Sequence, residues 1–173
     1  MGSPAAGSVF AQRVIIGVGD LGVSNAPETV LSTYALGSCI GVAAYDAAAR
    51  VGGILHFMLP NSRIAPAKAA AQPAMFADTG LPLFFRQLAT FGSPAERLQL
   101  FLAGGASIIG GEDPFRIGEH NRTAVLGFLA GGSYRLAGLE LGGAVNRTLH
   151  LDLARGILTL KTPRTESQIT LVR

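Results

Sequence analysis

The chain has 173 residues, of which 49% are hydrophobic and 14% are charged, and its formal net charge is +3. This composition excludes a disordered chain, and no apolar run reaches the roughly 18–20 residues that a membrane-spanning helix needs. The length fits one domain, which at this size buries about 70% of the surface of the unfolded chain. We therefore expect a single domain over residues 11–173, without membrane insertion, after a flexible N-terminus of residues 1–10.

Charge and cysteine usage narrow the class of protein further. The 14 Lys and Arg residues are scattered singly, with no basic block, and this pattern argues against nucleic-acid binding. Cys39 is the only cysteine, so neither an internal disulfide nor a four-cysteine metal site is possible. A lone thiol fits a reducing compartment, and the first residues lack the pattern of a signal peptide, so we expect a cytoplasmic protein.

Glycine and proline divide the chain into short predicted elements. Periodicity predicts strands, in chain order, over residues 14–19, 30–36, 39–45, 51–59, 98–103, 134–141, 148–153 and 157–161. It predicts helices over residues 79–91 and 118–130, and an irregular segment over residues 61–77, which contains Pro66 and Pro73. Strands in runs with two helices between them favour an α+β fold over a regularly alternating parallel sheet.

The stretch around Cys39 carries the most chemical information. Gly37 and Ser38 place the thiol after a flexible turn, where backbone N–H groups could stabilise an oxyanion. The polar turn at residues 46–50 predicts a hairpin, whose register would set His56 beside Cys39. A neighbouring imidazolium can lower the pKa of a thiol and hold a thiolate, which is the activated nucleophile for attack on an acyl carbon.

Less specific interpretations of these residues remain open at this point. A lone cysteine is commonly buried and inert, and a histidine in an apolar strand is commonly a core residue. Thr33 is by itself an ordinary strand residue. The three histidines, His56, His120 and His150, have no recognised metal-ligand spacing with Cys39.

Several motifs resemble the CheD family of chemoreceptor glutamine deamidases. A threonine stands six residues before the cysteine of LGSC (residues 36–39), and a histidine follows seventeen residues after it inside GGILHFMLP (residues 52–60). Further likenesses are ADTGLP (residues 77–82), GGAS (residues 104–107), IGEHN (residues 117–121), Gly142 with Gly143, and Arg147. The resemblance spans residues 14–162.

The resemblance implies an α+β fold with two packed β-sheets, a sandwich core, flanked by helices. This fold would be similar to the catalytic domain of cytotoxic-necrotizing-factor toxins. The implied reaction converts a glutamine side chain of methyl-accepting chemotaxis receptors to glutamate and releases ammonia, without a metal or organic cofactor. Cys39 would be the nucleophile, His56 the acid and base, and Thr33 the residue that orients His56. Backbone groups of Gly37 and Ser38 would bind the oxyanion.

The resemblance leaves a second function open, and the sequence differs from the family pattern at two places. Family members pair with a CheC-type phosphatase, so the same pocket could serve mainly as a binding site for that partner. A protease, an esterase or a transglutaminase is a further alternative for a Cys–His pair, although papain-type proteases place the histidine much farther along the chain. The chain departs from the family at residues Ile108–Phe115 and at Asn146, positions that could alter substrate or partner contacts.

Overall fold

The computed structural model describes residues 11–107 and 113–172 of the chain. One sheet, called sheet A here, has the order β1 (Gln12–Ile15), β3 (Thr29–Leu36), β8 (Arg147–Asp152), β9 (Ile157–Lys161) and β10 (Glu166–Thr170). The other, sheet B, has the order β2 (Asp20–Ser24), β5 (Val51–Phe57), β4 (Ile40–Asp46), β6 (Gln99–Gly104) and β7 (Arg135–Leu141). The helices are α1 (Pro66–Ala71), α2 (Ala77–Thr90) and α3 (Ile117–Ala130), and single turns of 3-10 helix occupy Ser62–Ile64, Pro73–Met75 and Ala95–Arg97.

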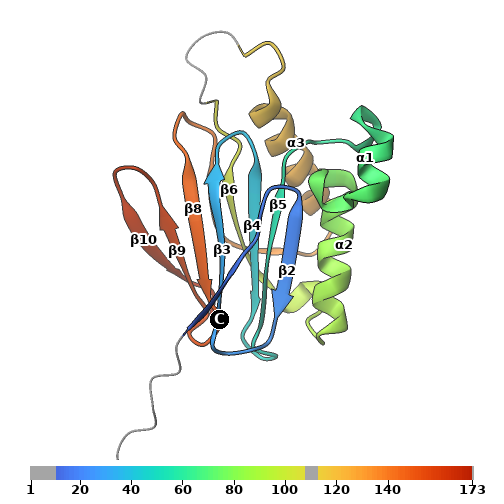
Figure 1. Cartoon of the computed structure of the whole chain (residues 1–173). Coiled ribbons are helices and arrows are strands. Elements are labelled where there is room, and N and C mark those ends of the chain that lie inside the picture. Colours follow the sequence, from blue (N-terminus) through green and yellow to red (C-terminus); the bar gives the residue numbers. More distant parts are fainter. Residues whose placement is uncertain (1–10, 108–112, 173) are drawn as a thin grey trace, which may run out of the picture.

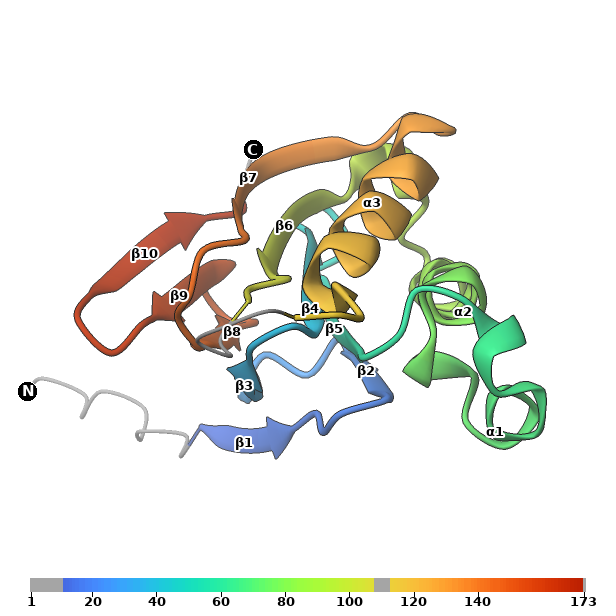
Figure 2. The same ribbon diagram turned by 90° about the horizontal axis from the view of Figure 1, so that it is seen from above.

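The elements form three layers, with sheet B in the middle (Figures 1 and 2). Sheet A packs on one face of sheet B through a cluster that includes Leu31, Ile54 and Leu151. Helices α2 and α3 cover the other face through a second cluster that includes Leu55 and Phe84. The predicted α+β architecture of two packed sheets is therefore confirmed, and the helices lie on one side of the sandwich.

Strands β4 and β5 are buried along their whole length. Because sheet A covers one face and the helices cover the other, these strands need continuous apolar sequences rather than an alternating pattern. They pair antiparallel, with Gly41 opposite His56, which confirms the predicted hairpin.

Other expectations from sequence need correction or fall outside the described residues. The predicted strand over residues 14–19 ends at Ile15, and Asp20–Ser24 forms β2, which the sequence did not indicate. The segment expected to be irregular contains α1, because Pro66 stands at the first helical position, where its missing N–H costs nothing. The expected flexible residues 1–10 lie outside the described part of the chain. No helix in that part is long and apolar enough to cross a membrane.

Candidate active site

Cys39 lies in the short connection that carries the chain from β3 in sheet A to β4 in sheet B. Near the end of β3, where its pairing with β8 shifts register, Ala35 has a φ of 56°, a left-handed value that residues other than glycine rarely adopt. The Gly37 N–H donates to the Ala35 carbonyl over 2.9 Å, which closes the turn. The strained connection thus presents Ser38 and Cys39 at the end of the sandwich.

The end of β6 holds this connection in place. The Gly105 N–H donates to the Cys39 carbonyl and the Ala106 N–H donates to the Gly37 carbonyl, each over 2.8 Å. Gly104 has a φ of 113°, and a Cβ atom at this position would collide with the Cys39 carbonyl oxygen. Glycine is therefore required where the two backbones approach, and this accounts for the GG of the motif at residues 104–107.

Thr33 joins His56 across the space between the two sheets. The Thr33 hydroxyl oxygen lies 2.7 Å from His56 Nδ1 and 2.8 Å from the Ile16 carbonyl oxygen. A hydroxyl has one hydrogen, and a carbonyl can only accept, so the Thr33 hydroxyl donates to Ile16 and accepts from His56. His56 therefore carries its proton on Nδ1, and Nε2 keeps a free lone pair.

Burial decides the charge of the imidazole. The His56 side chain is 1% exposed, and its Nε2 has no hydrogen-bond partner among the described residues. Removal from water lowers the pKa of His56 from 6.5 to about 4, because a buried charge is costly. At neutral pH the ring is uncharged and Nε2 can accept a proton.

Cys39 and His56 lie on the same face of the β4–β5 pair. Cys39 is two residues before Gly41, the residue opposite His56, so side-chain alternation places both side chains toward sheet A. Between them Gly41 contributes no side chain. Burial raises the pKa of the Cys39 thiol, although its own backbone N–H acts in the opposite direction. These directions favour a neutral thiol and a neutral imidazole in the free protein, rather than the thiolate–imidazolium pair suggested by the sequence.

The thiol borders an open pocket of about 360 Å³. Its lining residues are Ala35, Gly37, Ser38, Cys39, Ala106, Asp113, Phe115 and Ile117. His56 and Thr33 are not among them, and no hydrogen bond joins His56 Nε2 to the half-buried thiol. Phe115 is 75% exposed at the rim. The pocket is thus open to a side chain of another protein.

The two predicted oxyanion donors differ in availability. The Gly37 N–H is already donated to the Ala35 carbonyl within the turn. The N–H groups of Ser38 and Cys39 have no backbone acceptor among residues 11–107 and 113–172. These two N–H groups are therefore available to another acceptor.

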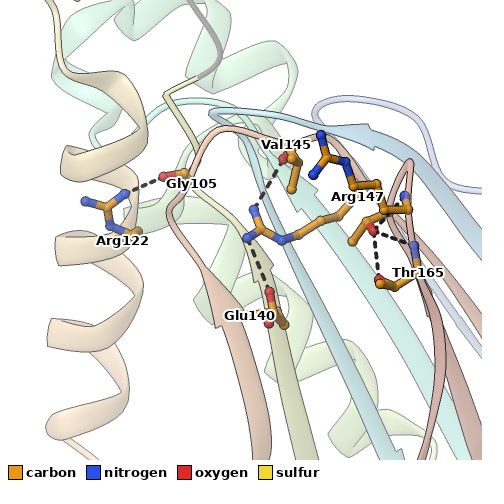
Figure 3. Close-up of polar contacts among 8 residues, drawn as sticks. Gly105, Arg122, Glu140, Val145, Arg147 and Thr165 are labelled. Carbon is orange, nitrogen blue, oxygen red and sulfur yellow. Dashed lines mark hydrogen bonds and ion pairs between the residues drawn. The ribbon is translucent and has the colours of Figure 1, made fainter.

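Two arginines support the surrounding backbone (Figure 3). Arg122 of α3 donates to the Gly105 carbonyl over 2.5 Å. Arg147 is buried opposite Leu36 in the β3–β8 register, where it contacts Glu140 at 3.3 Å and the Val145 carbonyl at 3.4 Å. Arg147 is the arginine that follows Gly142 and Gly143 in the sequence motif, to which the sequence assigned no role; its contacts show that it holds the chain before β8.

Sequence reasoning gave no role to Asn121. This residue is fully buried on α3, four residues before Val125 and eight before Leu129. A polar side chain on an otherwise apolar helix stripe was the available signal. In the part of the chain that the structure describes, no three His, Cys, Asp or Glu side chains converge as metal ligands would.

Comparisons with known proteins agree with the motifs. The family model described as CheD chemotactic sensory transduction matches residues 58–162. The probable chemoreceptor glutamine deamidase CheD of Solibacter usitatus (strain Ellin6076) is 45% identical over 150 residues, which cover 87% of this chain and 89% of that protein. The probable chemoreceptor glutamine deamidase CheD 1 of Syntrophus aciditrophicus (strain SB) is 40% identical over 86% of this chain and 93% of that protein.

A solved structure shows only a weak likeness. Neisseria meningitidis protein NMB0706 matches with a TM-score of 0.37 and 12% identity, over 76% of this chain and 62% of that chain. This match carries no argument about the fold or the site.

Proposed function

Since this chain belongs to the CheD family, we propose that it is a cysteine-dependent deamidase of chemotaxis receptors. It would hydrolyse glutamine side-chain amides of methyl-accepting receptors to glutamate and release ammonia. The new glutamates would then be available for methylation, which gives the protein a role in chemotaxis adaptation in the cytoplasm. The relatives' names and the family match support this substrate class.

The observation that carries the proposal is the chain of contacts from Ile16 through Thr33 to His56, in the strand paired with the one that follows Cys39, whose thiol borders an open pocket. It leaves His56 neutral with Nε2 unprotonated, on the same face as Cys39. A neutral base beside a thiol can remove its proton as the sulfur attacks, so a resting thiolate is not required.

The proposed reaction has two stages. His56 Nε2 takes the thiol proton as the Cys39 sulfur bonds to the amide carbon, and the Ser38 and Cys39 N–H groups stabilise the oxyanion. His56 then gives that proton to the leaving nitrogen, so ammonia departs and a thioester remains. In the second stage His56 takes a proton from water as the water oxygen bonds to the thioester carbon; the carbon–sulfur bond then breaks, His56 returns the proton to the Cys39 sulfur, and glutamate is released. Every step is acid–base or acyl-transfer chemistry of these side chains, so the proposal needs no cofactor.

Binding of a CheC-type phosphatase at the same pocket stays a prediction from the family resemblance. The exposed Phe115 ring at the pocket rim offers apolar surface that a protein partner could cover. In this alternative the partner competes with the receptor for Cys39. Retention of a receptor fragment on the immobilised protein, with and without excess phosphatase, would separate the two uses.

Mass spectrometry tests the proposed reaction. A signalling fragment of a methyl-accepting receptor is incubated with the full chain, and both its intact mass and the released ammonia are measured. The proposal expects the mass increase of an amide-to-acid conversion at glutamine, one ammonia per conversion, and an uncut backbone. Cleavage of the fragment, or cross-linking to an amine, would instead identify a protease or a transglutaminase.

A further inference from the structure

The side chain of Asn121 connects the thiol loop to the strand that carries His56. Its Nδ2 donates to the Ser38 carbonyl over 2.9 Å and to the Met58 carbonyl over 2.8 Å. An amide nitrogen has two hydrogens, so both are used. Ser38 precedes Cys39, and Met58 follows His56 by two residues, so one buried amide joins the two ends of the hairpin at which these side chains lie.

The contact to Ser38 also sets the direction of the Cys39 N–H. In a trans peptide the carbonyl and the following N–H point in opposite directions. When α3 holds the Ser38 carbonyl on one side, the Cys39 N–H therefore points to the other, away from Asn121. This N–H acts to lower the pKa of the Cys39 thiol, against the larger effect of burial, which raises it.

The asparagine at this position carries a cost as well as a gain in stability. The side chain is fully buried, and its Oδ1 has no hydrogen-bond partner among the described residues. A buried amide oxygen without a partner is costly. The same face of α3 otherwise carries the apolar residues Val125 and Leu129. The two hydrogen bonds from Nδ2 are therefore the reason for a polar residue here.

We propose that Asn121 is a positioning residue for the reaction. By holding the carbonyls of Ser38 and Met58, it keeps the thiol loop against β5 and aims the Cys39 N–H at the oxygen of the substrate amide. Asn121 acts through the backbone and does not touch the substrate. This inference rests on the proposed deamidase function.

Two variants remove the donor in different ways. Asn121→Ala leaves a small cavity, whereas Asn121→Leu nearly keeps the volume and suits the apolar surroundings, so it preserves the fold if the alanine variant does not. With the receptor fragment as substrate, we expect kcat to fall about 10²-fold, as for loss of an oxyanion donor, with KM changed less than threefold. Partial unfolding would also lower the apparent kcat without changing KM, so kcat is taken per folded molecule.

Tyr45→Phe is the matched control. Its hydroxyl donates to the buried Leu153 carbonyl over 3.0 Å, at the opposite end of β4 from Cys39. This variant also loses a buried side-chain-to-carbonyl hydrogen bond, so its melting temperature should fall, while kcat stays at the wild-type value. Thermal unfolding of all variants gives the folded fraction by which kcat is corrected.

A second readout needs no receptor. Alkylation of Cys39 by iodoacetamide follows the thiolate, and release of the Ser38 carbonyl should let the Cys39 N–H turn from the sulfur and move the midpoint of the pH–rate curve upward. If the wild type deamidates, a corrected kcat within twofold of wild type in both Asn121 variants overturns the inference. If the wild type does not deamidate, the proposed function fails, and the alkylation midpoint decides: an upward move supports the positioning of the N–H, and an unchanged one overturns it.

Discussion

The Thr33 hydroxyl can act only as an acceptor toward His56, because its single hydrogen is donated to the Ile16 carbonyl. The tautomer of the imidazole is therefore set by the Ile16 carbonyl, which precedes Cys39 by more than twenty residues in sequence. This relationship also assigns Thr33 a specific task, which is to hold Nδ1–H so that Nε2 is left for proton transfer.

The first prediction concerns this hydroxyl. Thr33→Val has nearly the same shape but cannot accept from His56, so the ring loses its orientation and kcat should fall between 10- and 100-fold. Thr33→Ser keeps the hydroxyl and should retain most of the activity. The measurement is the initial rate of ammonia release from a receptor fragment. Equal rates for the valine and serine variants would remove Thr33 from the account.

The second prediction concerns the close approach of β6 to the thiol loop. Gly104→Ala would push a methyl group into the Cys39 carbonyl and displace the loop, so activity should fall about 10²-fold. Gly127→Ala is the matched control, since a Cβ atom there meets nothing within 4 Å and Gly127 lies inside α3.

The control should keep full activity and gain about 0.5–1 kcal/mol of unfolding free energy, measured by urea denaturation. Full activity of Gly104→Ala would mean that the thiol loop does not depend on this contact.

The third prediction concerns stability against pH. Burial lowers the pKa of His56 to about 4 from 6.5, so between these values the unfolded chain binds the extra proton. The free energy of unfolding should therefore be unaffected by this group above about pH 6.5 and fall by up to roughly 3 kcal/mol as the pH drops to 4.

Burial, and then the positive charges of Arg13 and Lys161, also lower the pKa of His150. His56→Gln is therefore the needed comparison, and its curve should be shallower than that of the wild type in urea unfolding from pH 7 to 4. Parallel curves would show that His56 is not held neutral by the fold.

The fourth prediction concerns a buried carboxylate far from the thiol. Asp46 is 1% exposed and accepts from Arg97 at 2.9 and 2.7 Å. Burial by itself would raise the pKa of Asp46, but the hydrogen bonds from Arg97 and from the backbone N–H groups of Ala48 and Ala49 lower it overall. Asp46→Ala should cost roughly 2–3 kcal/mol, since Arg97 is partly exposed and can return to water.

Because Asp46 lies at the other end of β4, the rate of ammonia release per folded molecule should not change. Urea unfolding and the ammonia assay together check both halves of this prediction. A loss of rate beyond the loss of folded protein would show coupling between the two ends of the strand.

The hairpin and the main helices could be predicted from sequence because they depend on local patterns. The apolar runs of β4 and β5, the polar turn between them, and the spacing of Leu81, Phe84 and Leu88 each point to one element. The hairpin register also brought Cys39 and His56 to one face. What the local pattern could not give was the pairing of β3 with β8, which lies more than a hundred residues along the chain.

The remaining parts of the site depend on those long-range contacts. The bond from Thr33 to His56 exists only because sheet A packs on sheet B, and the Ile16 carbonyl reaches it only because β1 lies beside β3. Burial likewise sets both pKa directions, and neither could be derived from spacing. The neutral state of the pair, and the use of the Gly37 N–H within its own turn, therefore became visible only in the structure.

The central claim is that the Cys39 sulfur performs the reaction, and Cys39→Ala tests it most directly. This variant and the wild type are each incubated with the same receptor fragment, and the intact mass of the fragment is followed with time, after circular dichroism has shown that both are folded. We expect the amide-to-acid mass increase with the wild type and none with Cys39→Ala. An equal increase with the folded Cys39→Ala protein would contradict the account.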